Sequence, residues 1–203
     1  MFAMAEAFKN STFMKNFFFL ILAISLFCKP NSEKKIEKIL SNSTITDESA
    51  LVLIAREVWG EEFKSAETER LKNSKILIKV VSGYKTALTF YSQEDYAKNT
   101  ITQISIRILQ MLQSGKSRNL DSLVVVFSKP FYIKGTEEMQ DEFEIFRARV
   151  DMSDIKNPDE IFSINYFDEF VKGKPSKKAI QNAEQIRKIW KVELNDFGRI
   201  EVK

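Results

Sequence analysis

Two arginines separated by one residue, Arg147 and Arg149, are the best candidates for a binding site in this sequence. Residues 142–152 alternate in polarity as a β-strand does, so both guanidinium groups lie on one face of that strand. Two guanidinium groups on one face can bind a carboxylate or a phosphate through bidentate hydrogen bonds. The alternative interpretation is that each arginine pairs with a nearby acid such as Glu142 or Glu144.

The content of histidine and cysteine limits the chemistry that the chain can perform. The chain has no histidine, and so lacks the usual general base near neutral pH and the commonest metal ligand. Cys28 is the only cysteine, which excludes an internal disulfide and a zinc site of cysteines and histidines. A hydrolase would need paired carboxylates or a Ser–Lys pair, which only the fold can bring together. We therefore expect no cofactor and no metal, and we assign no catalytic residue.

Three short motifs resemble known signatures but lack the residues that would complete them. Residues 114–117 match the end of a phosphate-binding loop, but Gln110 stands where the first glycine belongs, and a helix precedes the motif instead of following it. Residues 196–198 read Asp-Phe-Gly, as in protein kinases, but no glycine-rich loop accompanies them. The acids of residues 151–160 lack the spacing of an EF-hand. We interpret these segments as a helix end, a turn and a solvated loop.

The residues from Met14 onward have the pattern of an export signal. Lys15 precedes an uninterrupted apolar run over residues 17–27, which is eleven residues long. A signal peptide needs about 7–15 apolar residues, whereas a membrane-spanning helix needs about 20. The sequence therefore predicts an exported protein with a signal peptide over residues 1–28, whose true start is Met14.

At the end of this run the sequence resembles the precursors of bacterial lipoproteins, in particular the loosely specified spirochaete type. Cys28 stands where such precursors carry the cysteine that becomes lipidated and begins the mature protein, and a lysine-rich polar segment follows it. The sequence departs from the usual signature at Ser25 and Phe27, where leucine and a small residue are normal. The resemblance covers residues 14–35 alone. It implies an envelope protein anchored to a membrane by acyl chains, such as palmitate, on Cys28.

Two other fates of the leader stay open. Residues 23–25 carry small side chains at the spacing of an ordinary signal peptidase site, so cleavage after Ser25 would release a soluble secreted protein. Alternatively, the apolar run stays uncleaved and serves as a short anchor. Cys28 would then be an ordinary small, weakly polar side chain.

Behind the leader, caps and hydrophobic spacing predict a series of helices and strands. The predicted helices cover residues 32–40, 46–71, 92–115 and 177–190, with a further helix start at 157–160. The predicted strands cover residues 75–82, 86–91, 120–128, 142–152, 192–194 and 200–202. Residues 123–127 are uniformly apolar, which is typical of a central strand. Alternation in the strand over 142–152 places Phe143 and Ile145 on the face of the two arginines.

Because strands arrive in pairs and not singly between helices, we expect an α+β fold with a mainly antiparallel sheet built from hairpins and helices packed on one face. We expect a tether with a short helix over residues 29–45 and a single domain over 46–203. A separate C-terminal unit from about residue 158 is the alternative. The net charge of +3 is spread over interleaved lysines and acids, so we expect no nucleic-acid partner.

These features together predict a non-enzymatic binding or scaffolding module of the cell envelope. The lipid on Cys28 would anchor the protein to a membrane, and the partner would be an unidentified envelope or extracellular protein. Two alternatives remain: an exported hydrolase that uses carboxylates or a Ser–Lys pair, and a soluble factor secreted after cleavage behind Ser25.

Overall fold

A computed structural model describes residues 32–83, 93–132, 139–171 and 174–197. The helices are α2 (Ser32–Ser41), α3 (Asp47–Trp59), α4 (Gln93–Gly115), α5 (Pro158–Ile161) and α6 (Lys177–Arg187). The main strands are β1 (Phe63–Arg70), β2 (Ile76–Ser82), β3 (Leu120–Tyr132), β4 (Met139–Asp151) and β7 (Lys191–Asn195). The leader with Cys28, the predicted strands at 86–91 and 200–202, and the predicted cap Ser92 lie outside the described residues.

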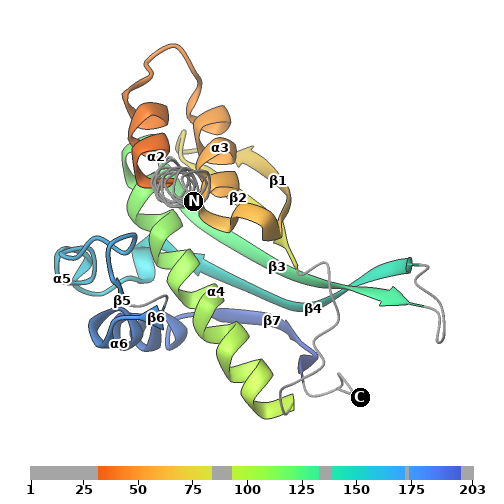
Figure 1. Ribbon diagram of the computed structural model, residues 1–203. Helices are drawn as coiled ribbons and strands as arrows, with labels where there is room; N and C mark the ends of the chain where they lie inside the picture. The colour runs from red at the N-terminus through yellow and green to blue at the C-terminus, as the bar shows by residue number, and fades with distance from the viewer. Residues whose placement is uncertain (1–31, 84–92, 133–138, 172–173, 198–203) are drawn as a thin grey trace, which may run out of the picture.

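Five strands form one sheet in the order β1-β2-β3-β4-β7. Neighbouring strands are antiparallel except β2 and β3, which are parallel because the chain crosses over through α4 between them. Helices α3 and α4 lie over one face of this sheet, and α6 packs beside α4 (Figure 1). The predicted α+β fold, with a mainly antiparallel sheet and helices on one face, is therefore confirmed.

The segment after α3 is a strand, whereas the sequence predicted that the helix would continue towards residue 71. Gly60 adopts a positive φ of 55° and ends the helix, and β1 then pairs along its length with β2. β1 is an edge strand rich in charged residues, and charged edge strands are a common protection against unwanted strand pairing. The sequence did not reveal this strand because it is mostly polar, and Phe63 and Thr68 are its only aromatic and β-branched residues.

The hydrophobic core lies between the sheet and the helices. Alternate residues of β3 and β4 point into it and stand opposite each other, as Leu123 does with Val150 and Val125 with Ala148. All four are fully buried, and side chains of α3 and α4 cover them. The run at 123–127 is central, as predicted. Because the helices cover a single face, Val124 on the other face stays half-buried.

The first described helix, α2, belongs to the packed body of the protein. Ile36 is only 3% exposed and joins the core cluster. Arg118, just before β3, donates hydrogen bonds to carbonyl oxygens at the end of this helix, those of Ile39 at 3.0 Å, Leu40 at 2.7 Å and Asn42 at 2.9 Å. Its other Nη contacts Asp47 at the start of α3, at 3.4 Å. One guanidinium group thus caps the C-terminus of α2 and pairs with a carboxylate at the N-terminus of α3.

Two contacts hold the first turns of α2 in the same position. Asn165 donates a hydrogen bond to Glu33 at 2.5 Å, and Lys35 forms an ion pair with Glu57 of α3 at 3.0 Å. The helix that we placed in the tether is therefore docked on the domain. Only residues 29–31 separate Cys28 from it.

Replacing Arg118 with alanine should release α2 from the body. The change leaves three helix-end carbonyls and the Asp47 carboxylate without their charged partner, so we expect the free energy of unfolding to fall by about 2–4 kcal/mol. Hydrogen exchange should show faster exchange of the α2 amides while the β2 and β3 amides stay protected. The control is Arg70→Ala, which removes an exposed ion pair with Glu48 and should cost less than about 1 kcal/mol. Equal exchange of α2 in wild type and Arg118→Ala would contradict the role of this arginine.

Candidate functional site

Arg147 and Arg149 lie together on the face of the sheet that α3 and α4 leave uncovered, which we call the open face. Each guanidinium group already has a carboxylate partner. Arg147 contacts Glu144 at 2.5 Å, and Arg149 contacts Asp151 at 2.7 Å. The hydrogen bond with Glu144 raises the pKa of Arg147, so its charge is held firmly. The pairing with a nearby acid such as Glu144 is what the structure shows, and an added anion would have to displace these carboxylates.

A bulge brings Glu144 to the side of Arg147. The register between β3 and β4 shifts after Phe127, so that Glu144, and not Ile145, stands opposite Ser128. An extra residue in one strand reverses the alternation beyond it. Phe143 therefore leaves the face of the arginines, and the predicted shared face was wrong at this position.

Asp151 is the centre of a charged network at the end of the open face. It accepts hydrogen bonds from Ser122 at 2.6 Å, Arg149 at 2.7 Å and Lys191 at 2.5 Å, and Lys191 also contacts Asp154 at 2.9 Å. Burial alone would raise the pKa of Asp151, but the hydrogen bonds from Lys191, Ser122 and Arg149 outweigh it and lower the pKa to about 2. The network joins β3, β4 and β7, and both carboxylate oxygens of Asp151 accept hydrogen bonds from the protein itself.

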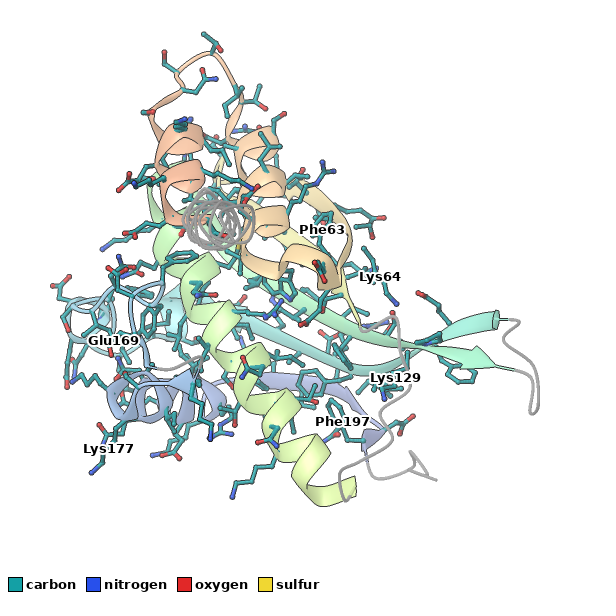
Figure 2. The ribbon with its side chains drawn as sticks, viewed as in Figure 1. Phe63, Lys64, Lys129, Glu169, Lys177 and Phe197 are labelled. Carbon is teal, nitrogen blue, oxygen red and sulfur yellow. The ribbon has the colours of Figure 1, made fainter. Side chains whose placement is uncertain are left out.

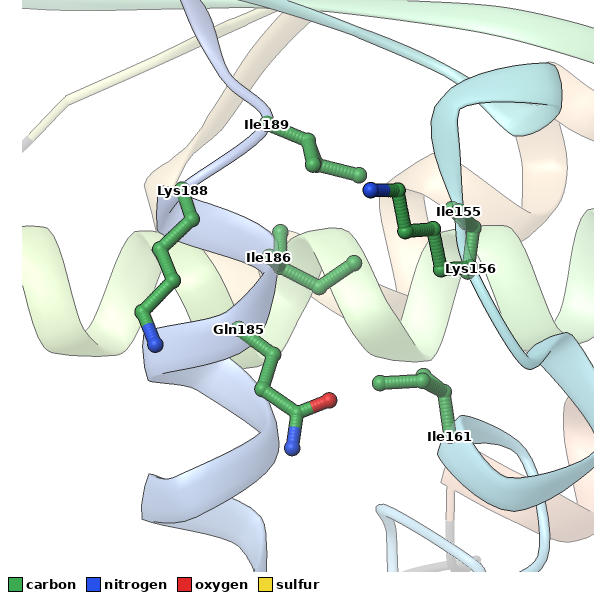
Figure 3. A pocket seen from close by; sticks show the side chains of 7 residues that line it. All are labelled: Ile155, Lys156, Ile161, Gln185, Ile186, Lys188 and Ile189. Atoms are coloured by element: carbon green, nitrogen blue, oxygen red, sulfur yellow. The ribbon is translucent and has the colours of Figure 1, made fainter.

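The described part of the chain also contains a pocket of about 320 Å³ between the α5 segment and the end of α6. Figure 3 shows the side chains that line it. They are Ile155, Lys156, Ile161, Gln185, Ile186, Lys188 and Ile189. Its volume is at the lower end of the range for small-molecule sites and would hold about ten groups the size of a methylene or a water. The sequence analysis did not predict this pocket.

Polar groups stand at the mouth of the pocket, while isoleucines form its inner surface. The ammonium group of Lys156 reaches across towards Ile189, and the amide of Gln185 faces the same opening, whereas the ammonium group of Lys188 points away along α6 (Figure 3). The arrangement suits an aliphatic group that carries an acceptor or a negative charge at one end. The lining has no carboxylate, hydroxyl, thiol or imidazole that could transfer a proton.

The wall of the pocket is held in place by buried hydrogen bonds. The hydroxyl of Tyr166 and the amide of Asn182 both donate to the carbonyl oxygen of Ile161. Gln113 of α4 donates to the carbonyl of Ile164 at 2.6 Å, and Gln110 donates to that of Tyr166 at 3.2 Å. Burial raises the pKa of Tyr166 to about 12, so it remains a hydrogen-bond donor at all physiological pH values. A four-residue helix, α5, is thus fixed by contacts from α4 and α6, and the pocket is preformed.

A Ser–Lys contact, which a hydrolase of this composition would need, is also present. Lys64 of β1 lies 2.8 Å from the hydroxyl of Ser128 on β3, but the same ammonium group forms an ion pair with Glu142 at 2.7 Å. A lysine that acts as a general base must be neutral and free to accept a proton, whereas this nitrogen is engaged with a carboxylate. Lys64 therefore forms an ion pair with Glu142, and the hydroxyl of Ser128 is its neighbour. Figure 2 shows Lys64 close to the strands β3 and β4.

The short motifs take structural roles. Gly115 ends α4, as predicted, and a Cβ there would come within 2.5 Å of Leu120. Phe197 is buried and its ring stacks on Phe127 at a centroid distance of 6.1 Å, so the phenylalanine of this motif contributes to the core. Within the described ranges no group of three acidic or cysteine side chains is arranged to hold a metal ion.

Comparison with known proteins gave no match: no family model, curated protein or solved structure matches the chain. None of the described helices is long and apolar enough to cross a membrane.

Replacing Asp151 with asparagine should destabilise the fold at neutral pH. The pKa of Asp151 is about 2 in the folded state against 3.8 for the ordinary group, so its ionised form contributes about 2 kcal/mol of stability. Because the folded-state pKa is lowered, this contribution is present above about pH 4 and is lost as the pH falls towards 2. Urea unfolding should therefore show a difference between wild type and variant at pH 7 that shrinks below pH 4.

The matched control for this prediction is Asp154→Asn. Asp154 contacts the same lysine, but its side chain is 38% exposed, so we expect a loss below about 1 kcal/mol. A pH-independent difference between wild type and Asp151→Asn would show that the carboxylate charge is not what stabilises the network.

Proposed function

We propose that the protein is a membrane-anchored envelope lipoprotein whose domain is a non-enzymatic binding module. The anchoring rests on the leader and on Cys28. The binding role is carried by one observation, the preformed pocket between α5 and α6, which can hold an aliphatic group and whose lining has no carboxylate, hydroxyl, thiol or imidazole. We propose that it receives an aliphatic group of an envelope or extracellular partner.

The position of α2 supports this proposal. A domain that begins directly behind its lipid is held at the membrane surface, where it meets partners of the envelope. A freely moving domain on a long tether would explore a wide shell instead. With α2 docked, the first of these situations applies to the lipidated protein.

The hydrolase alternative has one observation in its favour, the contact between Lys64 and Ser128. The ion pair with Glu142 speaks against it, because the lysine would have to lose its proton next to a carboxylate. We therefore keep the binding module as the proposed function.

Cells that express the protein should incorporate a clickable palmitate analogue into it, and Cys28→Ala should abolish the label. Cys28 is the only cysteine, so no other thiol can accept the acyl chain. Mass spectrometry of the mature N-terminus provides the second measurement: an acylated Cys28 supports anchoring, whereas a free N-terminal Leu26 supports secretion. Label that persists in Cys28→Ala would contradict the proposed anchor.

Filling the pocket should abolish binding of an aliphatic probe. Decanoate has the size and the single negative charge that the pocket suits, and calorimetry on the chain without its leader should detect saturable binding. Ile189→Trp should remove it. Ile180→Trp is the matched control, because Ile180 lies exposed on the preceding helix α6 and does not line the pocket.

The charge at the mouth can be tested with the same probe. Lys156→Gln should weaken decanoate about tenfold, which corresponds to about 1.4 kcal/mol, and should leave decanol unchanged. Equal binding of decanoate by wild type, Ile180→Trp and Ile189→Trp would refute the pocket as a binding site.

A further inference from the structure

We propose that the lipidated protein turns the helical side around the start of α2 towards the bilayer and its open face away from it. The bilayer is thus the partner of the α2 side, and the open face points to the aqueous side. This inference rests on the proposed function, because it requires a lipid on Cys28.

The short length of chain between the lipid and the folded body limits where the lipid can lie. Four Cα–Cα steps separate Cys28 from Ser32, the first residue of α2. Fully extended, they span at most about 14 Å. The lipid attachment point and the start of α2 therefore stay within that distance of each other in every conformation of the connector.

Helix α2 cannot move away from the body while its contacts hold. Arg118 binds its last carbonyls, Glu33 accepts from Asn165 in its first turn, and Ile36 is buried beneath it. The connector begins at a fixed point, and that point lies in the helical layer, where α2 packs beside α3 (Figure 1).

The far side of the sheet is out of reach of this anchor. Half the width of a helix is about 5 Å, and a sheet with the side chains of both its faces adds about 10 Å. The anchor would need about 15 Å simply to reach the level of the open face, and more to pass around the edge of the domain. A connector of at most about 14 Å, to which the cysteine side chain adds only a few ångströms, cannot cover this depth together with the path around the edge, so the helical side faces the membrane.

The surfaces of the two sides agree with these roles. α2 exposes Lys34 and Lys38, one turn apart, to solvent, and cations at such a position are attracted by anionic headgroups, although Glu37 offsets part of this charge. The open face carries half-buried aliphatic side chains between its ion pairs, those of Leu77, Val81 and Val124.

Site-specific quenching on vesicles tests this orientation. In the lipidated full chain the thiol of Cys28 is blocked, so one introduced cysteine gives one labelling site. Lys34→Cys labels α2, and Lys79→Cys labels the centre of β2 on the open face. The fluorescently labelled proteins are bound to phosphatidylcholine–phosphatidylglycerol vesicles that contain a lipid with a nitroxide in its headgroup. We expect at least threefold stronger quenching at position 34 than at position 79.

A variant with a longer connector separates the effect of length from that of surface charge. Twenty Gly and Ser residues inserted between Asn31 and Ser32 have an average span of about 25 Å, which permits either face to meet the bilayer. The ratio of quenching at the two positions should then fall towards one.

Each remaining outcome decides against a specific claim. Equal or reversed quenching in the protein with its natural connector overturns the orientation, and an unchanged ratio with the long connector shows that chain length does not set it. A chain that fails to float with the vesicles contradicts the lipid anchor, and the orientation is then overturned together with the proposed function.

Discussion

The contact of Arg118 with the end of α2 is the interaction on which the relation between domain and membrane depends. Its guanidinium group binds carbonyls that a helix end leaves unsatisfied, and it pairs with Asp47 at the start of the next helix. Because the side chain is only 12% exposed, these hydrogen bonds are poorly accessible to competing water. The contact turns a lysine-rich segment, which by composition suits a flexible tether, into a packed part of the body.

How much of this could be read from the sequence depends on the distance over which each interaction acts. Thr46 caps α3 by accepting a hydrogen bond from the amide of Ser49, and Gly115 ends α4; both are local signals, and both elements were predicted. β1 has no local signal, since its place is determined by pairing with β2. The docking of α2 depends on Arg118, which is remote in sequence, and only the crossover through α4 brings that residue near.

The candidate sites also combine features that local patterns predict with features that depend on residues remote in sequence. That Arg147 and Arg149 share a face follows from the period of a strand, and an acid partner for them was foreseen as an alternative. Lys191, which completes the network around Asp151, lies on β7, and no pattern in the sequence assigns that strand to the side of β4. The pocket was missed for a similar reason. Its two walls come from α5 and α6, and the contacts that fix them are made by buried polar side chains of α4 and α6, whose partners only the fold determines.

The polar groups of this protein are arranged to hold elements together, and this bears on the kind of function it can have. Catalysis needs groups whose charge or hydrogen bonding changes easily during a reaction. Here the acid with the strongest shift in pKa, Asp151, is surrounded by three donors, and Lys64 is paired with Glu142. The lowered pKa of Asp151 keeps its carboxylate ionised at neutral pH. Among the described residues the fold also forms an aliphatic pocket and an open sheet face on which Arg147 and Arg149 are paired with carboxylates. Surfaces of this kind can distinguish partners by fit, because binding there requires neither proton transfer nor the rearrangement of a charged site.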